Sequence, residues 1–153
     1  GTYGKKWISK KGNFFGSIFF PLKLDYPTYE EFSTINPIII FNVVKKFCKK
    51  KDISLKLPND ILVNKKKICG ILQEVITLND KRFLIIGIGL NIISSPNLNK
   101  KYLATNILYE TKTKPKIKEI TKQITYAYEN FFLNLKSYDF SSFKKKVKML
   151  ASS

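Results

Sequence analysis

Four short segments of the 153-residue chain combine glycines, lysines, amides and a carboxylate in ways that could perform chemistry. They are residues 1–7 (GTYGKKW), 56–60 (KLPND), 67–74 (KICGILQE) and 87–91 (GIGLN). Glycine lets a backbone approach a ligand closely, and the lysine ammonium group attracts anions. These residue types therefore favour the binding of an anionic ligand.

The first segment reads as a flexible loop. Gly1 and Gly4 stand three residues apart and are followed by Lys5, Lys6 and Trp7. The backbone N–H groups of such a loop can surround an anion. A frayed terminus with Trp7 in the core would give the same pattern, so both interpretations stay open.

The second segment centres on Pro58, which fixes a turn, and on Asn59 and Asp60 behind it. An amide and a carboxylate held rigidly at a strand end could face a cleft. Ordinary turn chemistry explains the same three residues equally well.

The third segment begins with Lys67 and is interrupted by Gly70. A glycine inside a strand often marks the close approach of a ligand or of another backbone. Strand alternation puts Lys67, Cys69 and Ile71 on one face. Lys67 would then meet a ligand through its ammonium group and Gly70 through its bare backbone. The alternative is a solvated lysine at a strand end.

The fourth segment places Gly87, Gly89 and Asn91 on one strand face. It lacks the GxGxxG spacing and the following helix of a dinucleotide fingerprint. Two glycines on one face could leave room for a flat ring, or could simply allow tight packing of a core strand.

Composition excludes several chemistries. The chain has no histidine, which rules out Ser-His-Asp and Cys-His catalysis and histidine-ligated metals. Cys48 and Cys69 are too few for a four-thiolate zinc site, and we expect them to be reduced core thiols. No Walker motif, paired catalytic carboxylates or metal-ligand cluster is present in the sequence.

The net charge of +17 is less informative than its size suggests, because 27 of the 28 basic residues are lysines. Bidentate recognition of bases or phosphates usually draws on arginine, and Arg82 is the only one. The apolar run at 83–93 is too short to span a bilayer, and no signal peptide is visible. We therefore expect a cytoplasmic protein.

The elements that must position these segments follow from hydrophobic periodicity. Strands are predicted at residues 14–20, 53–57, 61–64, 68–78 and 82–93. Helices are predicted at 30–51, 117–135 and 140–150. Pro37 belongs in the first turn of the first helix, and Asp139 or Ser141 caps the last. Central strands with helices beside and after them predict one α+β domain with a mostly antiparallel sheet.

Together, in this order and with these gaps, the segments resemble the catalytic domain of biotin protein ligases. GTYGKKW is similar to the second half of that family's glycine- and arginine-rich biotin loop. KLPND resembles its KWPND strand end, KKICGILQE its KxxGILxE strand, and GIGLN its GxGxN strand. Ala104, Thr105 and Asn106 match its AT-S/N segment. The resemblance covers nearly the whole chain and implies the biotin/lipoate protein ligase-like fold.

The resemblance implies an ATP-dependent ligase that forms biotinyl-adenylate and transfers biotin to a lysine of a biotin carboxyl carrier domain. It assigns catalysis to Lys67, Asp60 and Asn59. Biotin contacts would come from Gly1, Thr2, Gly4, Trp7, Lys67 and Gly70, and ATP contacts from Lys5, Lys67, Gly89 and Asn91. Magnesium would arrive with ATP and would need no dedicated protein site.

The chain also departs from the family pattern. Leu57 stands where an aromatic residue is usual, and Thr2, Tyr3 and Lys5 stand where arginines are common. The first half of the biotin loop and the small C-terminal barrel are not in the sequence, so we expect residues 1–153 to be a partial catalytic domain. We expect no membrane contact and no nucleic-acid binding through this region, and the resemblance leaves homodimerisation open.

Three alternatives remain. A lipoate or octanoate transferase shares the superfamily, but its triple-glycine loop is missing. A nucleic-acid-binding domain would need exposed aromatics among basic residues, whereas Phe14, Phe15, Phe19 and Phe20 are predicted to be core. Finally, a truncated ligase piece could lack activity of its own.

Overall fold

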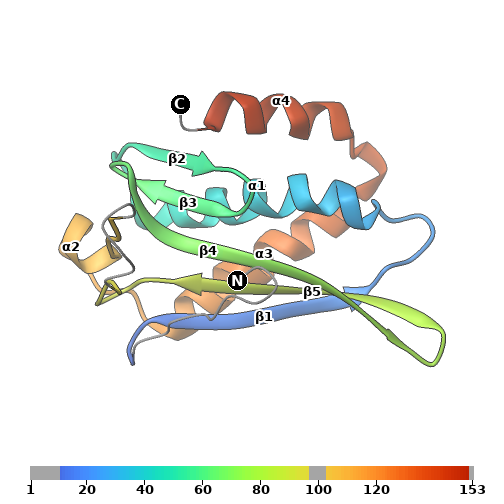
Figure 1. The fold of residues 1–153 in the computed structure, drawn as a ribbon, viewed down its shortest axis with the longest axis horizontal. Coiled ribbons are helices and arrows are strands. Elements are labelled where there is room, and N and C mark those ends of the chain that lie inside the picture. Colours follow the sequence, from blue (N-terminus) through green and yellow to red (C-terminus); the bar gives the residue numbers. More distant parts are fainter. Residues whose placement is uncertain (1–10, 97–102, 152–153) are drawn as a thin grey trace.

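An antiparallel sheet of five strands, in the order β1-β5-β4-β3-β2, forms the centre of the fold (Figure 1). The structure is a computed structural model that describes residues 11–96 and 103–151. Its strands are β1 (Phe14–Pro21), β2 (Ile53–Lys56), β3 (Asp60–Val63), β4 (Lys66–Leu78) and β5 (Lys81–Leu90). Asn79 and Asp80 have positive φ values and form the predicted tight turn between β4 and β5. The predicted α+β class and mostly antiparallel sheet are confirmed.

Two helices cover one face of this sheet, and a third packs beside them (Figure 1). The helical elements are α1 (Tyr29–Phe47), α2 (Ile107–Thr111), α3 (Ile117–Leu133), η1 (Leu135–Ser137) and α4 (Phe140–Leu150). α1 contacts the strands together with α3, while α4 lies against α1 and β2. Of the two predicted caps of α4, Asp139 is correct, since its carboxylate accepts from the Ser141 N–H at 3.1 Å. Within residues 11–96 and 103–151, no helix is long and apolar enough to cross a membrane.

Strand register divides the side chains between two faces. The inner face, which meets α1 and α3, carries the buried β5 residues Leu84, Ile86, Ile88 and Leu90. Gly87 and Gly89 alternate with them and point to the opposite side, which we call the outer face. The core therefore fills the space between the inner face and the helices, and the side chains of the outer face are not part of it.

Phe15 and Phe19 correct the prediction that all four β1 phenylalanines are core. Phe14 and Phe20 are buried, but Phe15 is 54% and Phe19 is 70% exposed. The reason is register, because Phe15 lies opposite Gly89 and Phe19 opposite Ile85 on the outer face. An apolar run without clear alternation does not reveal that one side of β1 faces away from the helices α1 and α3.

Pro37 lies in the middle of α1, which corrects its predicted place in the first turn. The helix begins earlier because Thr28 caps it, accepting from the Glu31 N–H at 3.2 Å, and because Glu30 and Glu31 favour its positive end. Proline has no N–H, so it offers no helical hydrogen bond to the Ser33 carbonyl one turn earlier. Burial of Pro37 within the apolar stretch of α1 offsets that cost.

A buried polar chain joins α1, α3 and β4. The Tyr128 hydroxyl donates to the Asn36 Oδ1 at 2.9 Å, and the Asn36 amide donates to Gln73 Oε1 at 2.7 Å. The Gln73 amide then donates to the Tyr29 carbonyl at 2.8 Å. Burial raises the pKa of Tyr128 above its ordinary range, so the phenol stays a donor. The chain of bonds thus fixes the distance between the sheet and its two covering helices.

Tyr128→Phe tests this polar chain. The substitution leaves the Asn36 carbonyl oxygen buried without its donor, and we expect it to lower the free energy of unfolding by about 1–3 kcal/mol. Tyr126→Phe is the matched control, because Tyr126 is 51% exposed on the same helix. Urea unfolding of both variants measures the effect, and equal stabilities would contradict the role given to the Tyr128 hydroxyl.

Candidate active site

An irregularity in the pairing of β3 with β4 decides where Lys67 points. Asp60 lies opposite Gly70 and Ile61 opposite Cys69, but Leu62 lies opposite Lys67, so Ile68 has no partner. One extra residue on one strand is a β-bulge, and it reverses the alternation beyond it. Lys67 therefore shares the outer face with Asp60 and Gly70.

This register corrects the prediction that Lys67 and Cys69 lie on the same face. Ile68 and Cys69 are consecutive and both buried, which strict alternation does not allow on a half-covered sheet. With the bulge, both turn inward and Lys67 turns outward. Lys67 and Gly70 can consequently approach one ligand from the same side.

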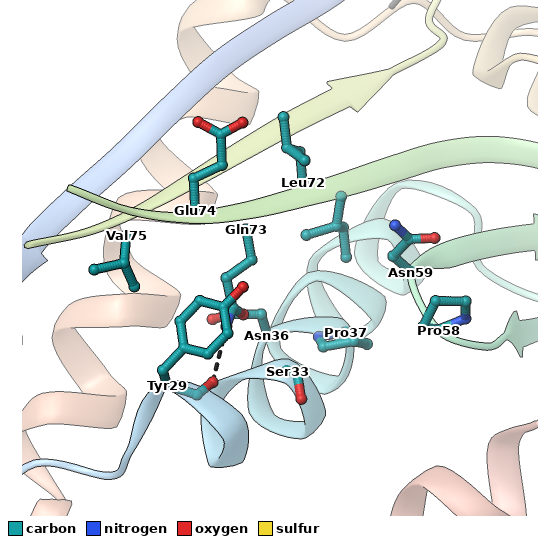
Figure 2. Close-up of a pocket in the computed structure, with 11 residues that line it drawn as sticks. Tyr29, Ser33, Asn36, Pro37, Pro58, Asn59, Leu72, Gln73, Glu74 and Val75 are labelled. Carbon is teal, nitrogen blue, oxygen red and sulfur yellow. Dashed lines mark hydrogen bonds between the residues drawn. The ribbon is translucent and has the colours of Figure 1, made fainter. Parts of the chain in front are cut away.

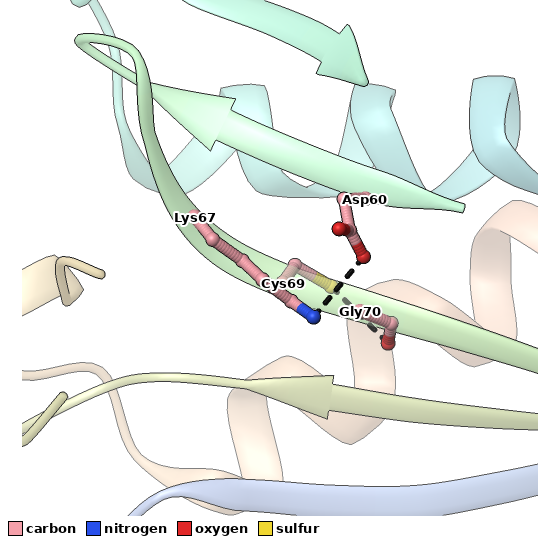
Figure 3. A network of polar contacts seen from close by, with 4 residues as sticks. All are labelled: Asp60, Lys67, Cys69 and Gly70. Atoms are coloured by element: carbon pink, nitrogen blue, oxygen red, sulfur yellow. Dashed lines mark hydrogen bonds and ion pairs between the residues drawn. The ribbon is translucent and has the colours of Figure 1, made fainter. Parts of the chain in front are cut away.

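The outer face holds an ion pair at this point. Lys67 Nζ lies 3.1 Å from Asp60 Oδ1, and the two side chains are 28% and 21% exposed (Figure 3). Because the pair is partly buried, salt and water screen the attraction between its charges less than in a fully solvated pair. The pair combines a cation that can neutralise a ligand's negative charge with a carboxylate that can accept a proton.

The Lys67 backbone is held from the other edge of β4. Its N–H donates to the Leu103 carbonyl at 2.9 Å, and its carbonyl accepts from the Thr105 N–H at 2.9 Å. Ala104 forms an isolated parallel β-bridge with Lys67. It thereby occupies the place beside β4 that β5 leaves when it ends at Leu90. Both hydrogen-bonding groups of the Lys67 backbone are therefore taken up by residues 103–105, on the edge of β4 away from β3.

Paired glycines lie beside the ion pair. Gly70 of β4 stands directly opposite Gly89 of β5, and Gly87 stands opposite Leu72. The predicted common face of Gly87 and Gly89 is confirmed. The three glycines form a strip of backbone on the outer face next to Lys67. It is smooth at the Gly70–Gly89 pair, where neither strand carries a side chain and a ligand could be held closely, and it is bordered by Leu72 at Gly87.

Asn91 follows this strip, and its side chain forms hydrogen bonds with other residues of the protein. Its amide donates to the Thr105 carbonyl at 3.1 Å, and its Oδ1 accepts from the Asn13 amide at 3.4 Å. The side chain thereby links the end of β5 to the segment that holds Lys67.

Asn59 lies apart from the ion pair. It lines a cavity of about 540 Å³ between α1 and β4, together with Pro58, Tyr29, Pro37 and Gln73 (Figure 2). Its carbonyl accepts from the Ile71 N–H at 3.0 Å, where β3 pairing with β4 ends. The structure thus joins Asp60 to Lys67, while the neighbouring amide faces the cavity.

Neither thiol is a nucleophile at neutral pH. Burial raises the pKa of Cys48 to about 11, with Glu110 adding to the rise. Burial also raises the pKa of Cys69 far above its ordinary range. Both cysteines are buried and free, as the sequence predicted. Gly1, Thr2, Gly4, Lys5 and Trp7 lie outside the described residues.

The comparisons with known proteins bear on this geometry. The family model described as the biotin/lipoate A/B protein ligase family matches residues 1–91. The chain belongs to this family.

Solved ligases share its fold. A biotin protein ligase from Aquifex aeolicus, in complex with biotin and ATP, is 25% identical, with a TM-score of 0.78 over 97% of this chain and 62% of its own. A ligase from Leishmania major, in complex with biotinyl-5-AMP, is 24% identical, with a TM-score of 0.82 over 99% of this chain and 66% of its own. The chain thus spans less than two thirds of either ligase.

A curated relative supports the same family. The bifunctional ligase/repressor BirA of Bacillus subtilis is 52% identical over 44 residues, which are 28% of this chain and 14% of that protein.

Sequence reasoning missed one buried polar residue that is bonded to the segment beside Lys67. Glu110 is buried in α2 and accepts hydrogen bonds from Thr105 and Asn64. The nearby Ala104-Thr105-Asn106 motif was a signal for the segment, but nothing in the sequence marked Glu110 as buried.

Gly87→Ala tests whether the glycine strip serves packing. A Cβ at Gly87 would lie 3.6 Å from Leu72 Cβ, an ordinary contact, so we expect the variant to be unchanged or more stable by up to about 1 kcal/mol. Gly12→Ala is the contrast, because Gly12 has φ +92 and an added Cβ would overlap the Ile93 side chain at Cδ1. Urea unfolding compares them, and a large loss in Gly87→Ala would make that glycine a packing residue.

Proposed function

We propose that the protein containing this chain is an ATP-dependent biotin–protein ligase. The observation that carries the proposal is the Lys67–Asp60 pair beside the Gly70–Gly89 strip on the outer face. It supplies one cation, one proton acceptor and a backbone surface without side chains, in a chain of the ligase family.

The first step joins two anions, and Lys67 suits it. The biotin carboxylate attacks the α-phosphorus of ATP, forming biotinyl-adenylate and releasing pyrophosphate. A positioned ammonium group stabilises the charge that builds up on the phosphoryl oxygens. Gly70 would let the ligand approach β4 closely. Lys5 and the backbone of residues 1–4 would add to the phosphate site, with Trp7 as an aromatic wall.

The second step needs a neutral amine, and Asp60 suits that. The acceptor lysine attacks the acyl carbon of the adenylate, a new amide bond forms, and AMP leaves. Asp60 would orient this amine or accept its proton. Asn59, next to Asp60 but facing the cavity, would contact the incoming chain. The acceptor would be a biotin carboxyl carrier domain.

The nucleotide would lie over the glycine strip. Gly89 and Asn91 border the outer face beyond Lys67, and Phe15 lies opposite Gly89 in register. An aromatic ring next to a smooth backbone can stack on a nucleobase. Magnesium would arrive with ATP as part of the substrate, held mainly by its phosphates.

Two proposals about the whole protein rest on the share of the solved ligases that the chain covers and on its two free thiols, which are typical of a reducing compartment. Residues 1–153 would be part of a ligase catalytic domain, and that ligase would act in the cytoplasm.

Biotin-dependent exchange of labelled pyrophosphate into ATP tests the proposal. We expect the full-length protein to exchange with biotin and not with lipoate. Lys67→Ala should slow exchange by about 100-fold, because an electrostatic donor of this kind contributes about 3 kcal/mol to the transition state. Lys66→Ala is the matched control. Lys66 is adjacent in sequence, alternates with Lys67 onto the opposite face of β4, where it lies opposite Val63, and has its Nζ 5.4 Å from the centroid of the Tyr109 ring.

The outcomes separate the alternatives. Exchange with lipoate in place of biotin would indicate the lipoate branch of the family. Equal losses in Lys67→Ala and Lys66→Ala would remove Lys67 from catalysis. Absence of exchange from the folded full-length protein would refute the adenylation chemistry itself.

A further inference from the structure

Glu110 is a buried carboxylate with a specific set of bonds. The residue is 8% exposed, and its two oxygens accept from different parts of the chain. The Thr105 hydroxyl donates to Oε2 at 2.6 Å, and the Asn64 amide donates to Oε1 at 2.7 Å. Both donors are neutral side chains, so the carboxylate is stabilised by hydrogen bonds.

The two donors flank Lys67 in space. Thr105 belongs to the segment that bonds the Lys67 backbone on one edge of β4. Asn64 stands in the β3–β4 turn, with φ 51, three residues before Lys67. Glu110 therefore connects the turn that precedes Lys67 to the segment that lies beside it.

Further bonds make this connection rigid. The Asn64 N–H donates to the Asp52 carbonyl at 2.8 Å, which anchors the turn to the β2 side. The Thr105 carbonyl accepts from the Asn91 amide, which anchors the segment to the end of β5. Thr105 and Asn64 are thus each anchored to a different strand, and the Glu110 carboxylate joins them to one another.

We propose that Glu110, acting through Thr105 and Asn64, is a positioning residue that holds Lys67 in register for the adenylation step. This inference rests on the proposed function for its catalytic consequence. The bulge leaves Lys67 next to Ile68, a residue of β4 that has no partner in β3. We call the Thr105–Glu110–Asn64 bonds the clamp. The clamp holds this part of β4 from the edge that faces away from β3. Its loss would let the ammonium group move relative to Asp60.

The test uses the Thr105 hydroxyl in the full-length protein. Thr105→Val removes the donor and keeps the shape, whereas Thr105→Ser keeps the donor. We expect Thr105→Val to lower kcat for biotin-dependent pyrophosphate exchange by about 10- to 100-fold, as small misplacements of reacting groups do. We expect KM for biotin to stay within about twofold and Thr105→Ser to restore most of the rate.

Two controls distinguish positioning from general stability. Thr111→Val removes a hydroxyl that bonds the Ile107 carbonyl within α2, and should leave the rate unchanged. In a Lys67→Ala background, Thr105→Val and Glu110→Ala should not slow pyrophosphate exchange any further. Residues that act only by positioning Lys67 have no effect on the rate once its ammonium group is gone. Equal rates in Thr105→Val and Thr105→Ser, or additive losses with Lys67→Ala, would overturn the inference.

Hydrogen exchange of backbone amides provides a reading independent of activity. We expect Thr105→Val and Glu110→Ala to reduce protection of the Lys67 and Thr105 amides by at least about tenfold, while the amides of the two paired strands β1 and β5 keep theirs. Unchanged protection at Lys67 would overturn the clamp even in an active enzyme. If the variants lose protection at Lys67 but the unmodified protein shows no pyrophosphate exchange, the ligase proposal is refuted while the structural role of Glu110 is supported.

Discussion

The β-bulge at Ile68, the residue of β4 that has no partner in β3, is the constraint on which the site depends. Alternation alone would turn Lys67 toward the helices and away from Asp60. The extra residue lets Ile68 and Cys69 both enter the core and returns Lys67 to the outer face, 3.1 Å from Asp60. An ammonium group placed in that core would have no water and no partner, so burial of two apolar side chains and exposure of the cation favour the same register.

The two faces of the sheet do different work. The inner face buries its aliphatic side chains against α1 and α3, and the chain of bonds from Tyr128 to Tyr29 holds those layers together. The outer face contributes little to this core, which frees it to carry glycines and a charged pair. Stability and the ligand binding that we propose for the outer face therefore make few competing demands on β4 and β5. The segment at 103–105 connects the two functions, because it continues the sheet and also holds Lys67.

Much of this architecture follows from local sequence. The strands, the Asn79-Asp80 turn, the amphipathic α3 and the Asp139 cap all rest on short-range patterns and lie where those patterns predict. The bulge could not be predicted, because Ile68 and Cys69 are both apolar and suit either register. The exposure of Phe15 and Phe19 depends on which face the helices cover, and the role of Glu110 depends on a turn 46 residues away. Pro37 was misplaced because tertiary burial outweighs its local cost.

A crystal structure of the full-length protein with a non-hydrolysable biotinyl-adenylate analogue tests the central claim most directly. We expect the analogue on the outer face, along Gly70 and Gly89, with an oxygen of its phosphate mimic about 3 Å from Lys67 Nζ. An analogue seated in the cavity beside Tyr29, or on any surface out of reach of Lys67, would contradict the account.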